Sequence, residues 1–181
     1  MEWFKNMNLP NKLTVIRICA IPIFLIFLYI SKGMFRFLPL LIFVAAALTD
    51  SIDGYIARRD NLITNFGKFM DPLADKLLTA SAFVAFVEIG YLRAWVVVII
   101  ISREFLVSGF RTLAASKGVK IAANPWGKIK TVFQMVLIVV VLLNYTGYAE
   151  FITSWIAPLT AIVVLLTVIS VPLECSSEML A

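Results

Sequence analysis

Long apolar runs dominate this chain and restrict what it can fold into. Of its 181 residues, 61% are hydrophobic and 15% are charged, whereas soluble domains are about 45–50% apolar and about 25% charged. A helix needs about 20 apolar residues to cross a bilayer, so a chain of this length holds about six spans. The composition argues strongly against a water-soluble enzyme and against a disordered chain. The apolar runs cover residues 13–30, 37–49, 77–87, a stretch from residue 94, 131–143 and 151–173.

We therefore expect an all-α integral membrane protein with six transmembrane helices in residues 13–173. Residues 1–12 mix apolar and basic side chains, a pattern typical of a short amphipathic helix that lies on the membrane surface. The runs at 77–87 and from residue 94 are short by hydropathy alone. They become full spans only if their polar ends face a protein-lined cavity.

The basic residues predict an orientation in the membrane. The net charge is +5, from sixteen Lys and Arg against eleven Asp and Glu. With the N-terminus inside, only Lys32, Arg36 and Arg93 fall outside, and the other thirteen cations face the cytoplasm. No polar basic face suited to nucleic acid is visible.

The absence of some residue types excludes several kinds of catalytic and metal site. It contains no histidine, which excludes His general bases, Ser-His-Asp triads and His-ligated zinc. Its two cysteines, Cys19 and Cys175, lie far apart in apolar segments and form no metal motif.

Two pairs of aspartates stand near the ends of apolar runs. Asp50 and Asp53 are spaced i,i+3, and Asp71 and Asp75 are spaced i,i+4, so each pair shares one face of a helix. Carboxylates about 4 Å apart repel by roughly 4 kcal/mol at an effective dielectric near 20. Divalent cations relieve that repulsion, and hard oxygen ligands favour Mg²⁺, Mn²⁺ or Ca²⁺ over zinc. Asp71 also fits a helix N-cap, with Pro72 as the first helical residue.

Small and basic residues follow the first aspartate pair. Gly54 and Ala57 allow a ligand to approach closely, and Arg58 offers a planar guanidinium to phosphate oxygens. This set suits a nucleotide diphosphate with its metal. Helix packing in lipid favours small residues too, so Gly54 and Ala57 alone are not diagnostic.

Read together, these positions form the pattern Asp50-x2-Asp53-Gly54-x2-Ala57-Arg58-x8-Gly67-x3-Asp71-x3-Asp75. The pattern resembles the complete signature of the CDP-alcohol phosphotransferases, in all eight positions. Segments 8–17, 65–78, 101–105 and 127–131 are similar to the bacterial phosphatidylglycerophosphate synthases of that family. The resemblance covers residues 6–170. Residues 174–181 depart from it, and we attribute this tail to truncation or to an expression scar.

The resemblance implies a homodimer in the bacterial cytoplasmic (inner) membrane, with two divalent cations, Mg²⁺ or Mn²⁺, and a cavity facing the cytoplasm. The implied reaction joins CDP-diacylglycerol and glycerol 3-phosphate to give phosphatidylglycerophosphate and CMP. Asp75 is the implied catalytic base. The implied metal ligands are Asp50, Asp53, Asp71 and Asp75. The implied CDP-binding residues are Asp50, Gly54, Ala57, Arg58 and Gly67.

A phosphorylated acceptor needs cations near the cytoplasmic side. We rank Arg103, Arg111 and Lys128 first for this role, because they lie on or beside the fourth and fifth spans. Arg103 and Glu104 also fit a second interpretation, in which they only pair with residues of neighbouring helices. The second-tier candidates are Asn11, Thr14, Arg17 and Lys130.

Two other functions stay open. The same chemistry suits another acceptor, such as serine, inositol, inositol phosphate or phosphatidylglycerol. A more distant alternative is a small ion-coupled transporter whose aspartates form an ion pathway. The concentration of charge on the cytoplasmic half favours an enzyme with a one-sided cavity.

Overall fold

The chain folds into helices throughout the part that the structure describes. The computed structural model describes residues 9–59, 65–116, 125–147 and 150–179; within them, the side chains of residues 50–59, 65–72, 75 and 113–116 are among those left undescribed. The described ranges contain no strand, which confirms the expected all-α class. The elements are α2 (Leu9–Ile30), η1 (Gly33–Phe37), α3 (Leu38–Arg59), α4 (Asn65–Glu88), α5 (Ala94–Ser116), α6 (Pro125–Tyr145), η2 (Glu150–Ile152) and α7 (Thr153–Met179).

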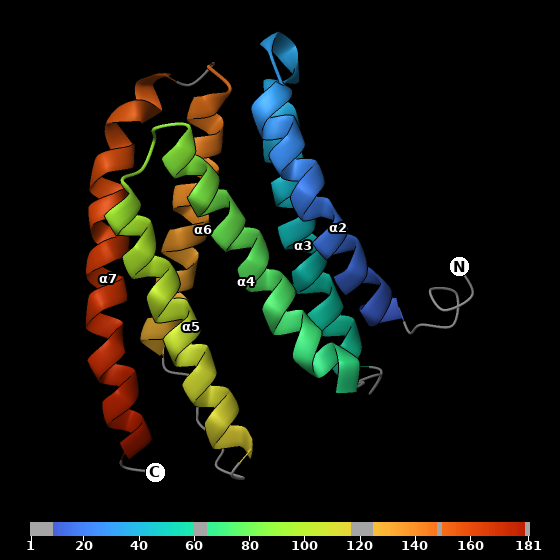
Figure 1. Cartoon of the computed structure of the whole chain (residues 1–181), viewed down its shortest axis with the longest axis vertical. Helices are drawn as coiled ribbons and strands as arrows, with labels where there is room; N and C mark the ends of the chain where they lie inside the picture. Colours follow the sequence, from blue (N-terminus) through green and yellow to red (C-terminus); the bar gives the residue numbers. More distant parts are fainter. Residues whose placement is uncertain (1–8, 60–64, 117–124, 148–149, 180–181) are drawn as a thin grey trace. The chain divides into compact units, whose positions relative to one another are not determined.

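Two compact units make up the chain, Met1–Ala85 and Phe86–Ala181, and the boundary falls inside α4. In the first unit, α2 and α3 lie side by side as a hairpin (Figure 1). The turn between them uses Gly33 at φ 56°, a conformation that glycine adopts without steric cost. Phe24 and Phe43 are fully buried and their ring centroids are 6.0 Å apart. This aromatic contact fixes α2 against α3.

The second unit is built around α7, which packs against both α5 and α6 (Figure 1). Its core comes from one apolar face of each helix, with Ile100, Leu137 and Val163 almost completely buried. The Asn144 amide donates a 2.6 Å hydrogen bond to the Thr153 hydroxyl. This bond joins the end of α6 to the start of α7 across a turn in which Gly147 has φ 79°.

The outer surface is apolar as well. Val98, Val132, Trp155 and Leu165 are each about half exposed or more, which is unusual for a soluble protein but normal next to lipid. Among the described residues, Gly127–Tyr145 and Thr153–Ser170 are long and apolar enough to cross a membrane. Shorter apolar helices run over Thr14–Ile30 and Phe35–Thr49. The described residues contain six long helices, and two of these meet the length and hydropathy of a membrane span by composition alone.

The expected interfacial helix at residues 1–12 and the tail at residues 174–181 lie partly outside the described residues. Residues 1–8 of the expected interfacial helix lie outside, whereas residues 9–12 belong to α2 and continue into the first apolar run. At the other end, α7 continues as a helix to Met179, through most of the tail 174–181.

Candidate active site

The aspartate pairs lie on two consecutive helices, as their spacing predicts. Asp50 and Asp53 belong to the C-terminal half of α3, and Asp71 and Asp75 belong to α4. The interpretation of Asp71 as an N-cap is wrong. Because α4 begins at Asn65, Asp71 lies inside the helix, about two turns from its start. A helix cap therefore no longer accounts for this carboxylate.

The side chains of all eight signature positions lie outside the described side chains. The described side chains include no group of three or more His, Cys, Asp or Glu able to hold a metal, and the four signature aspartates are not among them. The donor set itself fits Mg²⁺ or Mn²⁺, since it consists of carboxylate oxygens without His or Cys. The ligand roles stay predictions from sequence.

A buried ionic cluster occupies the second unit, and we call Arg103, Glu104 and Lys130 the Glu104 cluster. Lys130 of α6 is completely buried and its ammonium pairs with Glu104 Oε1. The same oxygen lies 3.6 Å from Arg103 Nη1. Arg103 Nε donates a 3.1 Å hydrogen bond to the hydroxyl of Ser170 on α7. Three helices therefore hold two cations around one carboxylate at fixed positions, at a place where an isolated charge would be costly.

One polar residue near this cluster was missed by the sequence interpretation. Gln134 lies one helical turn after Lys130 on α6 and is 5% exposed. Its Nε2 has no hydrogen-bond partner among the described residues. A buried amide without a partner is costly, so this donor is available to a ligand. The signal in the sequence was an amide inside the otherwise apolar run 131–143.

The other candidate cations differ in burial. Arg111 and Lys128 are exposed, whereas Lys130, ranked second-tier from the sequence, is the buried one. In the first unit, Thr14 and Arg17 are both buried on α2. The side chain of Asn11 lies outside the described ones. The structure thus brings Arg103 and Lys130 together through Glu104.

Comparison with known proteins shows which family the sequence belongs to. The sequence profile of the CDP-alcohol phosphatidyltransferases matches residues 7–169. The chain belongs to this family. It is a transferase, and the match includes the whole signature and the helices that carry it.

Within this family, the chain is similar to relatives that share one name. The chain is 45% identical to the CDP-diacylglycerol–glycerol-3-phosphate 3-phosphatidyltransferase of Bacillus subtilis, over 76% of this chain and 77% of the relative. Proteins of the same name from Rickettsia bellii and Haemophilus influenzae are 41% and 40% identical. The first covers 77% of both chains, and the second covers 79% of this chain and 80% of the relative. Bacterial relatives and apolar helices together indicate a membrane protein.

Proposed function

We propose that this enzyme transfers the phosphatidyl group of CDP-diacylglycerol to glycerol 3-phosphate, giving phosphatidylglycerophosphate and CMP in phosphatidylglycerol synthesis. The observation that carries the proposal is the likeness to relatives that bear the name of this reaction, over more than three quarters of both chains. The complete family signature on α3 and α4 supports it.

The four signature aspartates would hold two divalent cations, Mg²⁺ or Mn²⁺. When bound, these ions supply positive charge that offsets the pyrophosphate and the departing CMP. As ionised carboxylates, Asp50, Asp53 and Asp71 would be acceptor-only ligands. Gly54, Ala57 and Gly67 would leave room for the nucleotide, and Arg58 would donate hydrogen bonds to phosphate oxygens.

Asp75 is the proposed general base. It takes the proton of the acceptor hydroxyl while that oxygen attacks the β-phosphorus, which carries the diacylglycerol. The bond from this phosphorus to the oxygen of CMP breaks in the same step. A carboxylate is the natural base in a chain without histidine. No covalent intermediate with the protein is required.

The phosphate of the acceptor is assigned to the Glu104 cluster. Arg103 and Lys130 supply positive charge from buried, fixed positions, and Gln134 Nε2 adds a donor one turn away. Glu104 would orient both cations rather than touch the acceptor. Arg111 and Lys128 are exposed, so they suit attraction of the anion more than its final binding.

The remaining finer expectations belong to the same proposal. All six long helices would cross the bacterial cytoplasmic membrane, with the N-terminus and the active site facing the cytoplasm and residues 9–12 continuing an interfacial helix. The thirteen-to-three distribution of cations supports this orientation. We also propose a homodimer, on family resemblance.

The test is CMP release from CDP-diacylglycerol by the purified chain in detergent. Glycerol 3-phosphate, inositol phosphate, serine and no acceptor are compared, each with Mg²⁺, with Mn²⁺ and after chelation. We expect release only with glycerol 3-phosphate and a divalent cation. Release with another acceptor would move the chain to another branch of its family. No release from a folded sample under any condition would overturn the proposal and favour the transporter.

Asp75→Asn is the variant that tests the base. Its release should fall by about 10²–10⁴-fold, the usual contribution of a positioned general base. Asp60→Asn is the matched control, because Asp60 belongs to neither aspartate pair, and it should keep its activity. Equal activity of both variants would remove Asp75 from the mechanism.

A further inference from the structure

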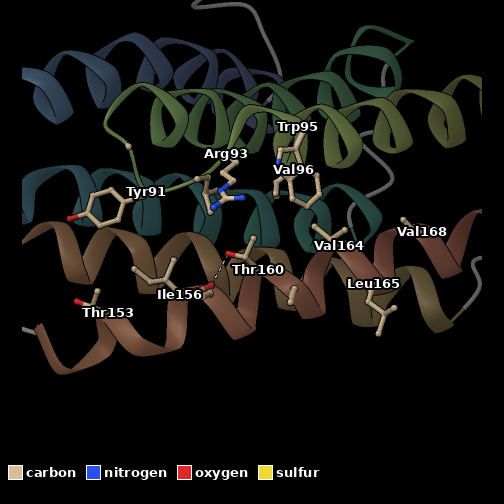
Figure 2. Close-up of a pocket in the computed structure, with 14 residues that line it drawn as sticks. Tyr91, Arg93, Trp95, Val96, Thr153, Ile156, Thr160, Val164, Leu165 and Val168 are labelled. Carbon is tan, nitrogen blue, oxygen red and sulfur yellow. Dashed lines mark hydrogen bonds between the residues drawn. The ribbon is translucent and has the colours of Figure 1, made fainter.

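An apolar groove runs along the second unit, and none of the residues that line it is assigned to the reaction. It has a volume of about 780 Å³, within the range of about 300–1,000 Å³ that is typical of small-molecule sites. One wall is the turn between α4 and α5 with the first turn of α5, and the other is α7 (Figure 2). Every third or fourth residue from Thr153 to Val168 lines it, so a single face of α7 forms that wall.

The wall is long enough to run through the full depth of one leaflet of a bilayer. From Thr153 to Val168, α7 rises about 22 Å at 1.5 Å per residue. One leaflet contributes about 15 Å of hydrocarbon, half of a core about 30 Å thick. Ala157 and Ala161 lie on the lining face, and their small side chains leave the groove hollow. An acyl chain therefore fits along α7 without bending out of the protein.

Polar and aromatic groups gather where the groove meets the α4–α5 turn. Arg93 is exposed, and among the described residues that line the groove it is the only charged one. Figure 2 shows its guanidinium directed toward α7, with Tyr91 and Trp95 on either side of it. Aromatic side chains of this kind favour the headgroup level of a membrane. A guanidinium there binds a lipid phosphate. It favours an anionic head over a zwitterionic one, because it repels the ammonium group that the zwitterionic head carries beside the same phosphate.

The groove is separate from the Glu104 cluster. Arg93 precedes α5, whereas Arg103 lies ten residues further along the chain, about 15 Å along the helix axis, and Glu104 follows it. In the proposed orientation, Arg93 lies on the side of the membrane opposite the cytoplasm, which the proposed active site faces. A lipid held at Arg93 is therefore no substrate in position for transfer.

We propose that this groove binds one anionic phospholipid, with its phosphate at Arg93 and one acyl chain along α7. The groove matches the parts of such a lipid in order. Its charged end matches the phosphate, the aromatic residues match the headgroup level, and the apolar length matches the acyl chain. The bound lipid is a resident of the protein and is neither the donor nor the product of the proposed reaction.

Native mass spectrometry of the full chain tests this. Delipidated protein in mild detergent is mixed with equimolar phosphatidylglycerol and phosphatidylethanolamine, and retained lipid is identified by mass. The wild type should retain one phosphatidylglycerol per chain in preference to phosphatidylethanolamine. Arg93→Gln should lose about tenfold or more of that preference, as expected for a lost charge-assisted hydrogen bond. Ala161→Phe, which fills the groove, should lose both lipids.

Matched controls remove a cation or add bulk elsewhere. Lys32→Gln removes an exposed cation that does not line the groove, and Val98→Phe enlarges an exposed residue of α5 outside it. Both should retain lipid like the wild type. CMP release by Arg93→Gln should equal that of the wild type, so failure of this proposal and failure of the proposed function are distinguishable.

Three results would overturn the proposal. In the first, Arg93→Gln keeps the wild-type preference for phosphatidylglycerol. In the second, Ala161→Phe retains as much lipid as Val98→Phe. In the third, Ala161→Phe changes a dimer into a monomer while lipid retention stays constant, which would assign the groove to a second copy of the chain. Because Arg93 is exposed, its variant keeps the test valid even if Ala161→Phe fails to fold.

Discussion

At the scale of single residues, two neighbouring lysines have opposite environments. Lys130 is completely buried and paired with Glu104, whereas Lys128 is exposed. Residues two apart on a helix point in directions about 160° apart, so they cannot share one environment. The same difference makes them a natural test of the acceptor site.

We predict that Lys130→Met raises the KM for glycerol 3-phosphate by roughly 10–100-fold. This is the effect of losing a hydrogen bond to a charged group, about 1.5–3 kcal/mol. Lys128→Met should change KM by no more than about twofold, because exposed charges contribute little. Steady-state kinetics with varied glycerol 3-phosphate measure both. Lowered thermal stability of Lys130→Met with an unchanged KM would mean that Lys130 has a structural role only.

Gln134 gives a second prediction at this scale. Replacing it by Leu removes a buried amide whose Nε2 has no partner among the described residues. Folding stability should therefore stay the same or rise, while the KM for glycerol 3-phosphate rises about tenfold. Met135→Leu, at the next position of α6, is the control. A fall in stability without a change in KM would contradict the assignment of Gln134 to the acceptor.

At the scale of elements, most helices could be predicted from their apolar runs, but their limits could not. The run 77–87 predicts a short span, whereas α4 extends back to Asn65. Hydropathy decides which part of a helix enters lipid, and polar residues such as Asp71 continue a helix without difficulty. Pro72 suggested a helix start because proline is common at the first position of helices, where its missing N–H leaves no hydrogen bond unmade.

The sequence also left the partners of the cations undetermined. Arg103 and Glu104 stand out in the sequence because charges are costly in an apolar run, but the sequence does not show which residues they pair with. That Lys130 rather than Lys128 pairs with Glu104 depends on how α5 and α6 are rotated in the second unit. Only the packing of whole helices sets that rotation.

The hydrogen bond between Asn144 and Thr153 gives a prediction for the α6–α7 hairpin. A double-mutant cycle of Asn144→Ala and Thr153→Val should give a coupling energy of about 0.5–2 kcal/mol, the range for polar contacts between membrane helices. Unfolding of each variant in increasing concentrations of a denaturing detergent measures this coupling energy. Strictly additive losses would show that the 2.6 Å contact contributes nothing to the hairpin.

At the scale of the whole molecule, the distribution of charge is the property with the widest consequence. Thirteen of sixteen basic residues fall on one side if every long helix crosses the membrane. Exposed apolar side chains such as Val98 and Leu165 lie on the described helices of the second unit. Both observations depend on composition, which is why the membrane class could be predicted from sequence with few assumptions.

We predict that single cysteines will report this topology in intact cells. In a Cys19→Ser, Cys175→Ser background, Lys32→Cys should react with a membrane-impermeant thiol reagent added outside. Lys117→Cys should react only after the membrane is made permeable. Labelling of both positions from the same side would contradict six crossings with the N-terminus in the cytoplasm.

The ion pair between Lys130 and Glu104 has a consequence for biosynthesis. Glu104 lies near the middle of the 23-residue helix α5, where one charge costs about 2.5–3.5 kcal/mol during insertion. Its partner is on α6, which leaves the ribosome later. A nascent chain that ends after α5 has to hold a carboxylate in lipid without that partner. If α5 crosses the membrane as proposed, we therefore expect its stable integration to wait for α6, with the two helices entering the bilayer as one cotranslational unit.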